Sequence, residues 1–239
     1  MRHHLRIKLQ NDRIFRDGSF PKMRSEYVFD IDPVPVVRNT EFRVRENLLR
    51  TDTVSAILSF PDRHVCALNF ANANVPGGAY VFGGNAQEEA LCRATLLYYT
   101  IRTVRGFYRR NRLHVLPDYT HGMIFSSNVP VIRDNDGNRI ENPVACDFIT
   151  SPAVNRTFAK FFFSRARLER TMAKRIERIV ALAARNQPDV LILGAYGCGA
   201  FGNRRETVYP QFEQAINRYL PDNVQVVFAD PHPSSSLIP

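Results

Sequence analysis

Two adjacent acids, Glu88 and Glu89, stand ten residues after a glycine-rich turn in the segment PGGAYVFGGNAQEEALCR (76–93). Placed at the mouth of a loop, such a pair can transfer protons to and from a bound ligand. Neighbouring residues on a helix diverge by about 100 degrees, so the two acids must take different roles. Acids also favour the first turn of any helix because they offset its dipole, and capping is therefore the alternative interpretation.

Two glycine-rich loops of the same construction follow apolar segments. Residues 65–70 have the length of a buried strand and precede Gly77 and Gly78, and residues 189–193 precede the segment GAYGCGAFGN (194–203). Glycine lets the backbone bend through positive φ and approach a ligand closely. Free N–H groups at the carboxyl ends of strands attract phosphate. Two such loops predict a ligand with two phosphates, or one long ligand.

Apolar periodicity predicts the elements that position these loops. We expect strands at 65–70, 123–132, 144–149, 189–193 and 224–229, and an edge strand at 27–39 that Pro33 and Pro35 interrupt. We expect helices at 41–58, 86–105, 165–186 and 209–220, the last with Pro210 at its first position. Residues 1–25 are basic and irregular. Alternation of strands and helices predicts an α/β sandwich in a single domain.

Composition restricts the classes of partner and compartment. The formal net charge of +9 predicts a surface that attracts polyanions, including nucleic acid. The four cysteines are widely spaced, which indicates free thiols in a reducing compartment rather than a metal site. There is no apolar run of eighteen residues and no secretory signal pattern. We therefore expect an intracellular protein, cytoplasmic or nuclear, with no membrane contact.

The helix expected at 165–186 has an apolar face and a basic face. The basic face predicts either solvated surface or a track for a polyanion, and it carries Arg165, Arg167, Arg170, Lys174, Arg175 and Arg178.

Four segments together resemble the microbial-type poly(ADP-ribose) glycohydrolases, a branch of the macrodomain superfamily; they span 68–93, 123–137, 148–155 and 191–203. The resemblance extends from about residue 65 to about 230, and the N-terminal 45 residues carry none of it. It implies a macrodomain-like three-layer α/β/α sandwich with a mixed central sheet. We expect an N-terminal extension at 1–45 packed on the core, the glycohydrolase domain at 46–232 and a tail at 233–239.

The resemblance also implies an activity: hydrolysis of the ribose–ribose O-glycosidic bonds of poly(ADP-ribose), by a monomer that needs no metal or other cofactor. Glu89 is then the catalytic acid/base, and Glu88 binds the hydroxyls of the ribose under attack. Two alternatives stay open. One is a hydrolase that removes single ADP-ribosyl groups from protein or nucleic acid, and the other is a non-catalytic module that binds ADP-ribose.

The substrate-binding residues are carried over from the same resemblance. Asn72 is expected to bind the distal ribose, with Asn69 and Asn74 as alternatives. Backbone N–H groups are expected to face the diphosphate on one side from Gly77, Gly78 and Ala79, and on the other from Gly197, Cys198, Gly199 and Ala200. Phe201 is expected to pack against the ribose or adenine, or alternatively to lie in the core. Further substrate contacts are expected from Gln87, Gly202 and Asn203. The adenine pocket is expected to be walled by Phe125, Ser126 and Ser127.

The chain departs from the family pattern at two places. Ala79 replaces a third glycine, which is harmless at negative φ and crowds the diphosphate at positive φ. Arg204 and Arg205 stand where relatives more often have an acid and a proline, which adds positive charge beside the expected phosphates.

Overall fold

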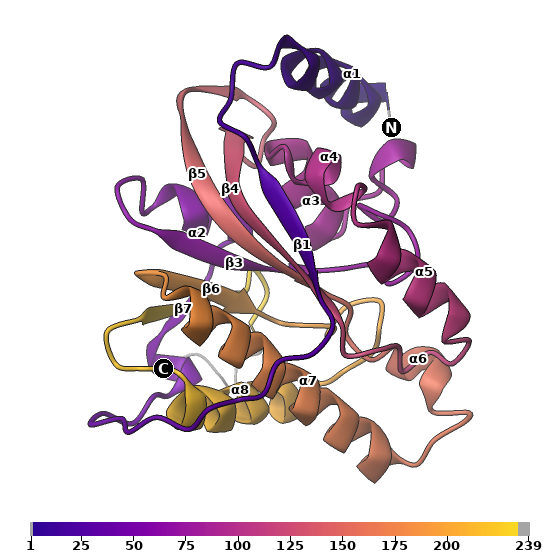
Figure 1. The fold of residues 1–239 in the computed structure, drawn as a ribbon, viewed down its shortest axis with the longest axis vertical. Coiled ribbons are helices and arrows are strands. Elements are labelled where there is room, and N and C mark those ends of the chain that lie inside the picture. Colours follow the sequence, from indigo (N-terminus) through magenta and orange to yellow (C-terminus); the bar gives the residue numbers. More distant parts are fainter. Residues whose placement is uncertain (1, 234–239) are drawn as a thin grey trace.

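The centre of the molecule is a mixed sheet (Figure 1). A computed structural model describes residues 2–233. Seven strands run in the order β1-β4-β5-β3-β6-β7-β2. Strands β1, β4 and β5 pair antiparallel, and β5, β3, β6, β7 and β2 pair parallel. The strands are β1 (Arg24–Val28), β2 (Leu48–Leu49), β3 (Val65–Phe70), β4 (Met123–Arg133), β5 (Arg139–Ser151), β6 (Val190–Gly194) and β7 (Gln225–Ala229).

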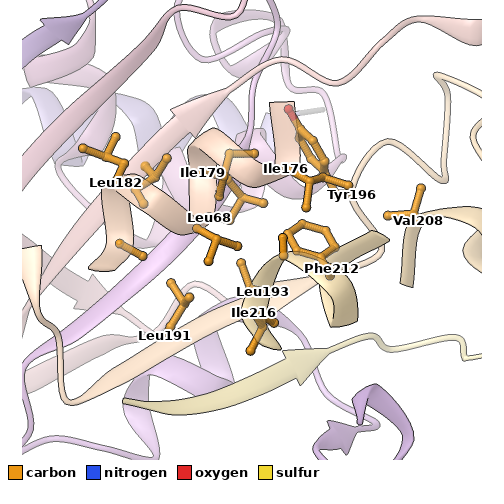
Figure 2. Close-up of a cluster of buried hydrophobic side chains, with 14 of the residues drawn as sticks. Leu68, Ile176, Ile179, Leu182, Leu191, Leu193, Tyr196, Val208, Phe212 and Ile216 are labelled. Carbon is orange, nitrogen blue, oxygen red and sulfur yellow. The ribbon is translucent and has the colours of Figure 1, made fainter. Parts of the chain in front are cut away.

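Helices cover both faces of this sheet. Alternate residues of β3 point to opposite faces: Cys66 and Leu68 join the core under α7 and α8 (Figure 2), and Val65 and Ala67 join the core under α2, α3, α4 and α5. The predicted three-layer sandwich with a mixed sheet is therefore confirmed. The helices are α1 (Arg2–Asp17), α2 (Thr53–Leu58), α3 (Gln87–Ala94), α4 (Leu97–Ile101), α5 (Arg105–Leu113), α6 (Arg156–Ala159), α7 (Arg165–Asn186) and α8 (Arg205–Tyr219).

The N-terminal region is not irregular as predicted, because α1 is a regular helix that packs beside α3 and α4. Its buried face combines Ile7 and Ile14 with the fully buried Asn11, whose amide donates to the carbonyl of Arg93 at 2.8 Å. The polar Asn11 interrupts the apolar stripe, and this conceals the helical period in the sequence.

The N-terminal strand and the helix after it are both shorter than predicted. Strand β1 lies at the sheet edge as expected, but it ends at Val28, before Pro33 and Pro35. Within residues 41–58, α2 is the one α-helix that the structure describes. The short 3-10 helix η1 (Val44–Glu46) and the strand β2 precede it. The side chain of Asp52 caps α2 by accepting a hydrogen bond from the N–H of Ser55 at 3.0 Å.

The helix predicted at 86–105 is broken in two. Thr95 leaves the helical path to form a bridge with Val131, and its hydroxyl donates to the carbonyl of Leu91 at 2.8 Å and accepts from the N–H of Leu97 at 3.0 Å. Helix α8 also differs from the prediction, since it starts earlier and contains Pro210 in its interior.

The strand predicted at 144–149 is longer in the structure, as β5, whereas the predictions for β3 and for three of the cysteines are confirmed. Strand β3 has the predicted bounds, and Cys66, Cys92 and Cys146 are buried thiols. Within residues 2–233, none of the helices combines the length and the apolar character needed to cross a membrane.

Candidate active site

The two glycine loops meet at one edge of the sheet. Strands β3 and β6 are parallel neighbours, so the loop after β3 (71–86, the first loop) and the loop after β6 (195–204, the second loop) leave from the same edge. A pocket of about 960 Å³ opens there. Residues of both loops and of the α3 start line it, and they include Phe70, Ala86, Gln87, Gly197, Gly199, Ala200 and Phe201.

Glu88 is buried and held by two asparagines. Its Oε2 accepts the N–H of Asn72 at 2.7 Å, and its Oε1 accepts the amide of Asn69 at 3.3 Å. Burial raises the pKa of Glu88 to about 8, and these hydrogen bonds only partly offset the loss of solvation. Glu88 is therefore mostly protonated at neutral pH.

Glu89 is also buried, but one of its carboxylate oxygens has no hydrogen-bond donor in the described chain. Its Oε1 accepts the N–H of Ala79 at 2.8 Å, whereas no donor among residues 2–233 reaches the buried Oε2. A buried carboxylate oxygen without a partner is costly unless a ligand or water completes it. Glu89 thus has an oxygen available for proton transfer, which Glu88 does not.

The first loop wraps around these carboxylates. Gly78 has φ of +55°, and a Cβ there would collide with Oε1 of Glu89 and lie 3.2 Å from Oε2 of Glu88. A Cβ on Gly77, at φ of +68°, would lie 2.9 Å from the ring of Tyr98. Both positions require glycine because the backbone approaches side chains of this chain closely.

The prediction that this loop points its N–H groups at a diphosphate therefore needs correction. The N–H of Gly78 donates to the carbonyl of Val75 at 3.1 Å, and the N–H of Ala79 donates to Glu89. The N–H of Gly77 is directed at Glu88. Ala79 has φ of −91°, so its methyl group is unstrained and the departure from a third glycine is harmless.

The polar side chains after β3 act mainly as supports. Asn72 uses its Oδ1 to accept the N–H groups of Asn74 and Val75, at 2.9 and 3.0 Å. Gln87 bonds both sides of the β3 end: its Oε1 accepts the N–H of Phe70 at 2.9 Å, and its Nε2 donates to the carbonyl of Leu68 at 2.8 Å. Gln87 fixes the start of α3 to the strand, and its amide has little capacity left for the predicted substrate contact.

The second loop, in contrast, has N–H groups to offer. Within the described chain, no acceptor bonds the N–H groups of Gly199, Ala200 and Phe201, and a Cβ on Gly199 would meet nothing within 4 Å. The N–H groups of Cys198 and Asn203, by comparison, donate to carbonyls of the same loop at 3.0 and 3.1 Å. The N–H of Gly202 donates to Gly199 at 2.9 Å. The N–H of Gly197, which also lines the pocket, has no acceptor in the described chain either. Anion binding therefore centres on Gly197 and 199–201 rather than on Cys198.

Phe201 and Phe70 both place aromatic rings in the pocket lining, and Phe201 is the one predicted from the sequence. Its ring lies 6.2 Å from that of Tyr119, centre to centre, and it packs partly against the core. The predicted adenine wall stays a prediction: Phe125, Ser126 and Ser127 lie in β4 beside β1, and the pocket lining includes none of them.

An ion pair beside the second loop was not anticipated from the sequence. Arg205 donates to both oxygens of Asp230, at 2.6 and 3.0 Å, and Tyr209 donates to the same carboxylate at 2.6 Å. Burial alone would raise the pKa of Asp230, but these hydrogen bonds outweigh it and hold the pKa below its ordinary value. The charge of Arg205 is thus compensated. The sequence does contain a signal for Asp230 as a residue of this region, because it directly follows the apolar run of β7.

We expect Asp230→Ala to lower the free energy of unfolding by about 2–4 kcal/mol, because it leaves a guanidinium and a hydroxyl without their partner in a largely buried place. Urea unfolding followed by circular dichroism measures this. Glu206→Ala is the matched control: Glu206 is 58% exposed and lies 3.9 Å from Arg204, so its removal should cost less than about 1 kcal/mol. Equal losses in the two variants would contradict the assignment.

Arg175 is an arginine that is fully buried, unlike Arg205. Arg175, predicted on the basic face of α7, is 0% exposed. Its guanidinium donates to the carbonyls of Pro152, Asp118 and Tyr119, at 2.8, 2.7 and 3.1 Å. One side chain of α7 thereby holds the segment that carries Tyr119 and the segment that follows β5.

Comparisons with known proteins agree with this geometry. The family model described as microbial-type PARG, catalytic domain, matches residues 6–134. Poly(ADP-ribose) glycohydrolase of Thermomonospora curvata, solved with the inhibitor ADP-HPD, has a TM-score of 0.81 at 26% identity, over 99% of this chain and 96% of that one. The Deinococcus radiodurans enzyme, solved with ADP-ribose, has a TM-score of 0.69 at 31% identity, over 78% and 77%. No curated protein matches the sequence significantly.

The three-layer sandwich, the two buried carboxylates and the unbonded N–H groups of the second loop agree with an α/β glycosidase of the macrodomain type. The chain belongs to the microbial-type poly(ADP-ribose) glycohydrolase family. The family match starts at residue 6, so the expectation that the N-terminal 45 residues carry no resemblance is wrong.

Proposed function

We propose that this chain hydrolyses the ribose–ribose O-glycosidic bonds of poly(ADP-ribose) and releases ADP-ribose. The observation that carries the proposal is the unpartnered Oε2 of Glu89, buried beside a protonated Glu88 at the start of α3, where Ala86 and Gln87 line the pocket. Membership of the family supplies the substrate class. A module that only binds ADP-ribose would need no such unsatisfied carboxylate oxygen.

The proposed reaction divides the work between the two acids. Glu89 gives its proton to the departing 2′-oxygen as the bond from that oxygen to the anomeric carbon breaks through an oxocarbenium-like state. Water then attacks the anomeric carbon, and its proton returns to Glu89. Glu88, uncharged and fixed by Asn69 and Asn72, holds the ribose hydroxyls. The free N–H groups of 199–201 stabilise the diphosphate.

Incubation with labelled polymer, followed by separation of the products on a gel, tests the function. We expect free ADP-ribose to accumulate as long chains disappear. Release from singly modified protein or nucleic acid, with polymer left intact, would instead support the mono-ADP-ribosyl hydrolase. Binding of ADP-ribose with no release from either substrate would support a reader module.

The raised pKa of Glu88 predicts a pH-dependent stability. In the folded state Glu88 keeps its proton up to a pKa of about 8, whereas the unfolded chain releases it near the ordinary value of 4.5. Its contribution to stability is therefore complete below about pH 4.5 and is lost as the pH rises towards 8. We expect Glu88→Gln, uncharged throughout, to gain Tm relative to the parent as the pH increases. Parallel Tm curves for the two proteins between pH 5 and 8 would contradict this.

The polymer is the partner we propose, although the basic face of α7 is smaller than the sequence indicates. Arg175 is buried, Arg178 pairs with Asp30, and Arg165 pairs with Glu169 at 2.7 Å. Arg170 and Lys174 are the exposed cations of that face that have no acid within 4 Å in the described chain. Binding of nucleic acid, the monomeric state, the intracellular location and the three domain boundaries stay predictions.

A further inference from the structure

Three phenylalanines are exposed together on α6 and the turn that follows it. Phe158, Phe161 and Phe162 are 59%, 75% and 62% exposed. Their spacing of three and four residues places them on one side of a helical turn, which the bond from the N–H of Phe161 to the carbonyl of Phe158 continues at 3.1 Å. Ala159, on the other side, is fully buried in the core. Single exposed apolar residues are ordinary, but an adjacent group of this kind marks a binding surface.

Positive charge surrounds these rings. The segment 156–168 contains no acidic residue and four cations: Arg156, Lys160, Arg165 and Arg167. Two of them have acids nearby, since Arg165 pairs with Glu169 at 2.7 Å and Arg167 lies 3.9 Å from Asp118. The Nζ of Lys160 lies 5.2 Å from the ring centre of Phe161. No acidic group of the described chain lies within 4 Å of Lys160. Aromatic rings combined with cations are the features that stack planar bases and hold their phosphates.

The exposed rings adjoin the second loop directly. The N–H of Thr157 donates to the carbonyl of Phe201 at 3.2 Å, and its hydroxyl donates to the carbonyl of Ala200 at 3.1 Å. Helix α6 is thus bonded to the second loop, whose residues 199–201 line the pocket and have unbonded N–H groups. In Figure 1 helix α6 lies at the periphery of the molecule.

We propose that Phe158, Phe161 and Phe162, termed the phenylalanine platform, stack the adenine of the ADP-ribosyl unit next to the one in the pocket, and that Lys160 attracts its diphosphate. This rests on the proposed function, since it assumes a polymeric substrate. Free ADP-ribose carries one adenine and occupies the pocket alone. The phenylalanine platform therefore raises affinity for the polymer and leaves affinity for the monomer unchanged.

The double substitution Phe161→Ser and Phe162→Ser tests the phenylalanine platform, because both side chains are exposed and their loss should not affect folding. Fluorescence anisotropy compares Kd for a polymer of several ADP-ribosyl units with Kd for ADP-ribose, in a Glu89→Gln background that prevents turnover. We expect Kd for the polymer to rise about tenfold and Kd for ADP-ribose to stay the same. Leu9→Ser is the control, since Leu9 is 59% exposed on α1, and it should change neither value.

An unchanged Kd for the polymer would overturn the proposal. A loss of affinity for single-stranded oligo(dA) equal to the loss for the polymer would also overturn it, in favour of a general nucleic-acid surface. Size-exclusion chromatography that showed a dimer in the parent and a monomer in the double variant would assign the rings to a second copy of this chain. The proposed function is tested separately, by release of ADP-ribose from the parent protein.

Discussion

Glu89→Gln should lower the rate of ADP-ribose release by about 10²–10⁴-fold while Kd for ADP-ribose stays within about tenfold. The amide keeps the shape of the side chain, and its oxygen can still accept the N–H of Ala79, but it cannot give or take the proton. Rates of product release and calorimetric binding of ADP-ribose measure the two quantities.

The control for this variant is Glu206→Gln. Glu206 is also an acid in the first turn of a helix, α8, and is 58% exposed. It reproduces the loss of a charge near a helix N-terminus without touching the site. Turnover retained by Glu89→Gln, or lost equally in Glu206→Gln, would exclude Glu89 as the acid/base.

Gly78→Ala should reduce the rate about a hundredfold and destabilise the fold by roughly 1–2 kcal/mol. The alanine would be strained at φ of +55°, and its methyl group would displace the carboxylate of Glu89. A shift of about 1 Å in a reacting group can cost that factor in rate. Steady-state kinetics and urea unfolding measure the two effects.

Ala79→Gly is the matched control in the same loop. At φ of −91° the alanine is unstrained, so glycine brings no new conformation and costs about 0.5–1 kcal/mol through backbone entropy. We expect its rate to stay within about twofold of the parent. A large rise in activity would show that the methyl group does crowd the substrate.

Local patterns in the sequence predicted the frame of the site. The strands before both glycine loops are continuous apolar runs of buried-strand length, so β3 and β6 were found within one residue at each end. The carboxyl ends of neighbouring parallel strands lie at the same edge of a sheet, and a glycine-rich loop follows each of these two strands. The sequence therefore predicted that Glu89 and 199–201 lie in the same region of the molecule. Elements shorter than two turns, such as α6, leave no comparable period.

Contacts between distant segments could not be predicted in the same way. Arg175 was placed on the exposed face because a charged residue is normally solvated, yet its acceptors lie in segments remote in sequence. The spacing of Leu168, Met172, Arg175 and Ile179 did contain the signal, since 175 occupies an apolar position of the stripe. The acceptors of the first-loop N–H groups could not be predicted either. A glycine indicates that the backbone comes close to another group, but it does not indicate which group that is.

The buried Arg175 also limits which segments of this chain can be exchanged for those of a relative. Its single guanidinium completes the backbone of two separate segments, one ending at Pro152 and the other carrying Tyr119. A designer who transplants either segment from a relative must therefore transplant a compatible residue of α7 with it. The segment at Pro152, the segment that carries Tyr119 and the α7 position of Arg175 therefore have to be exchanged together.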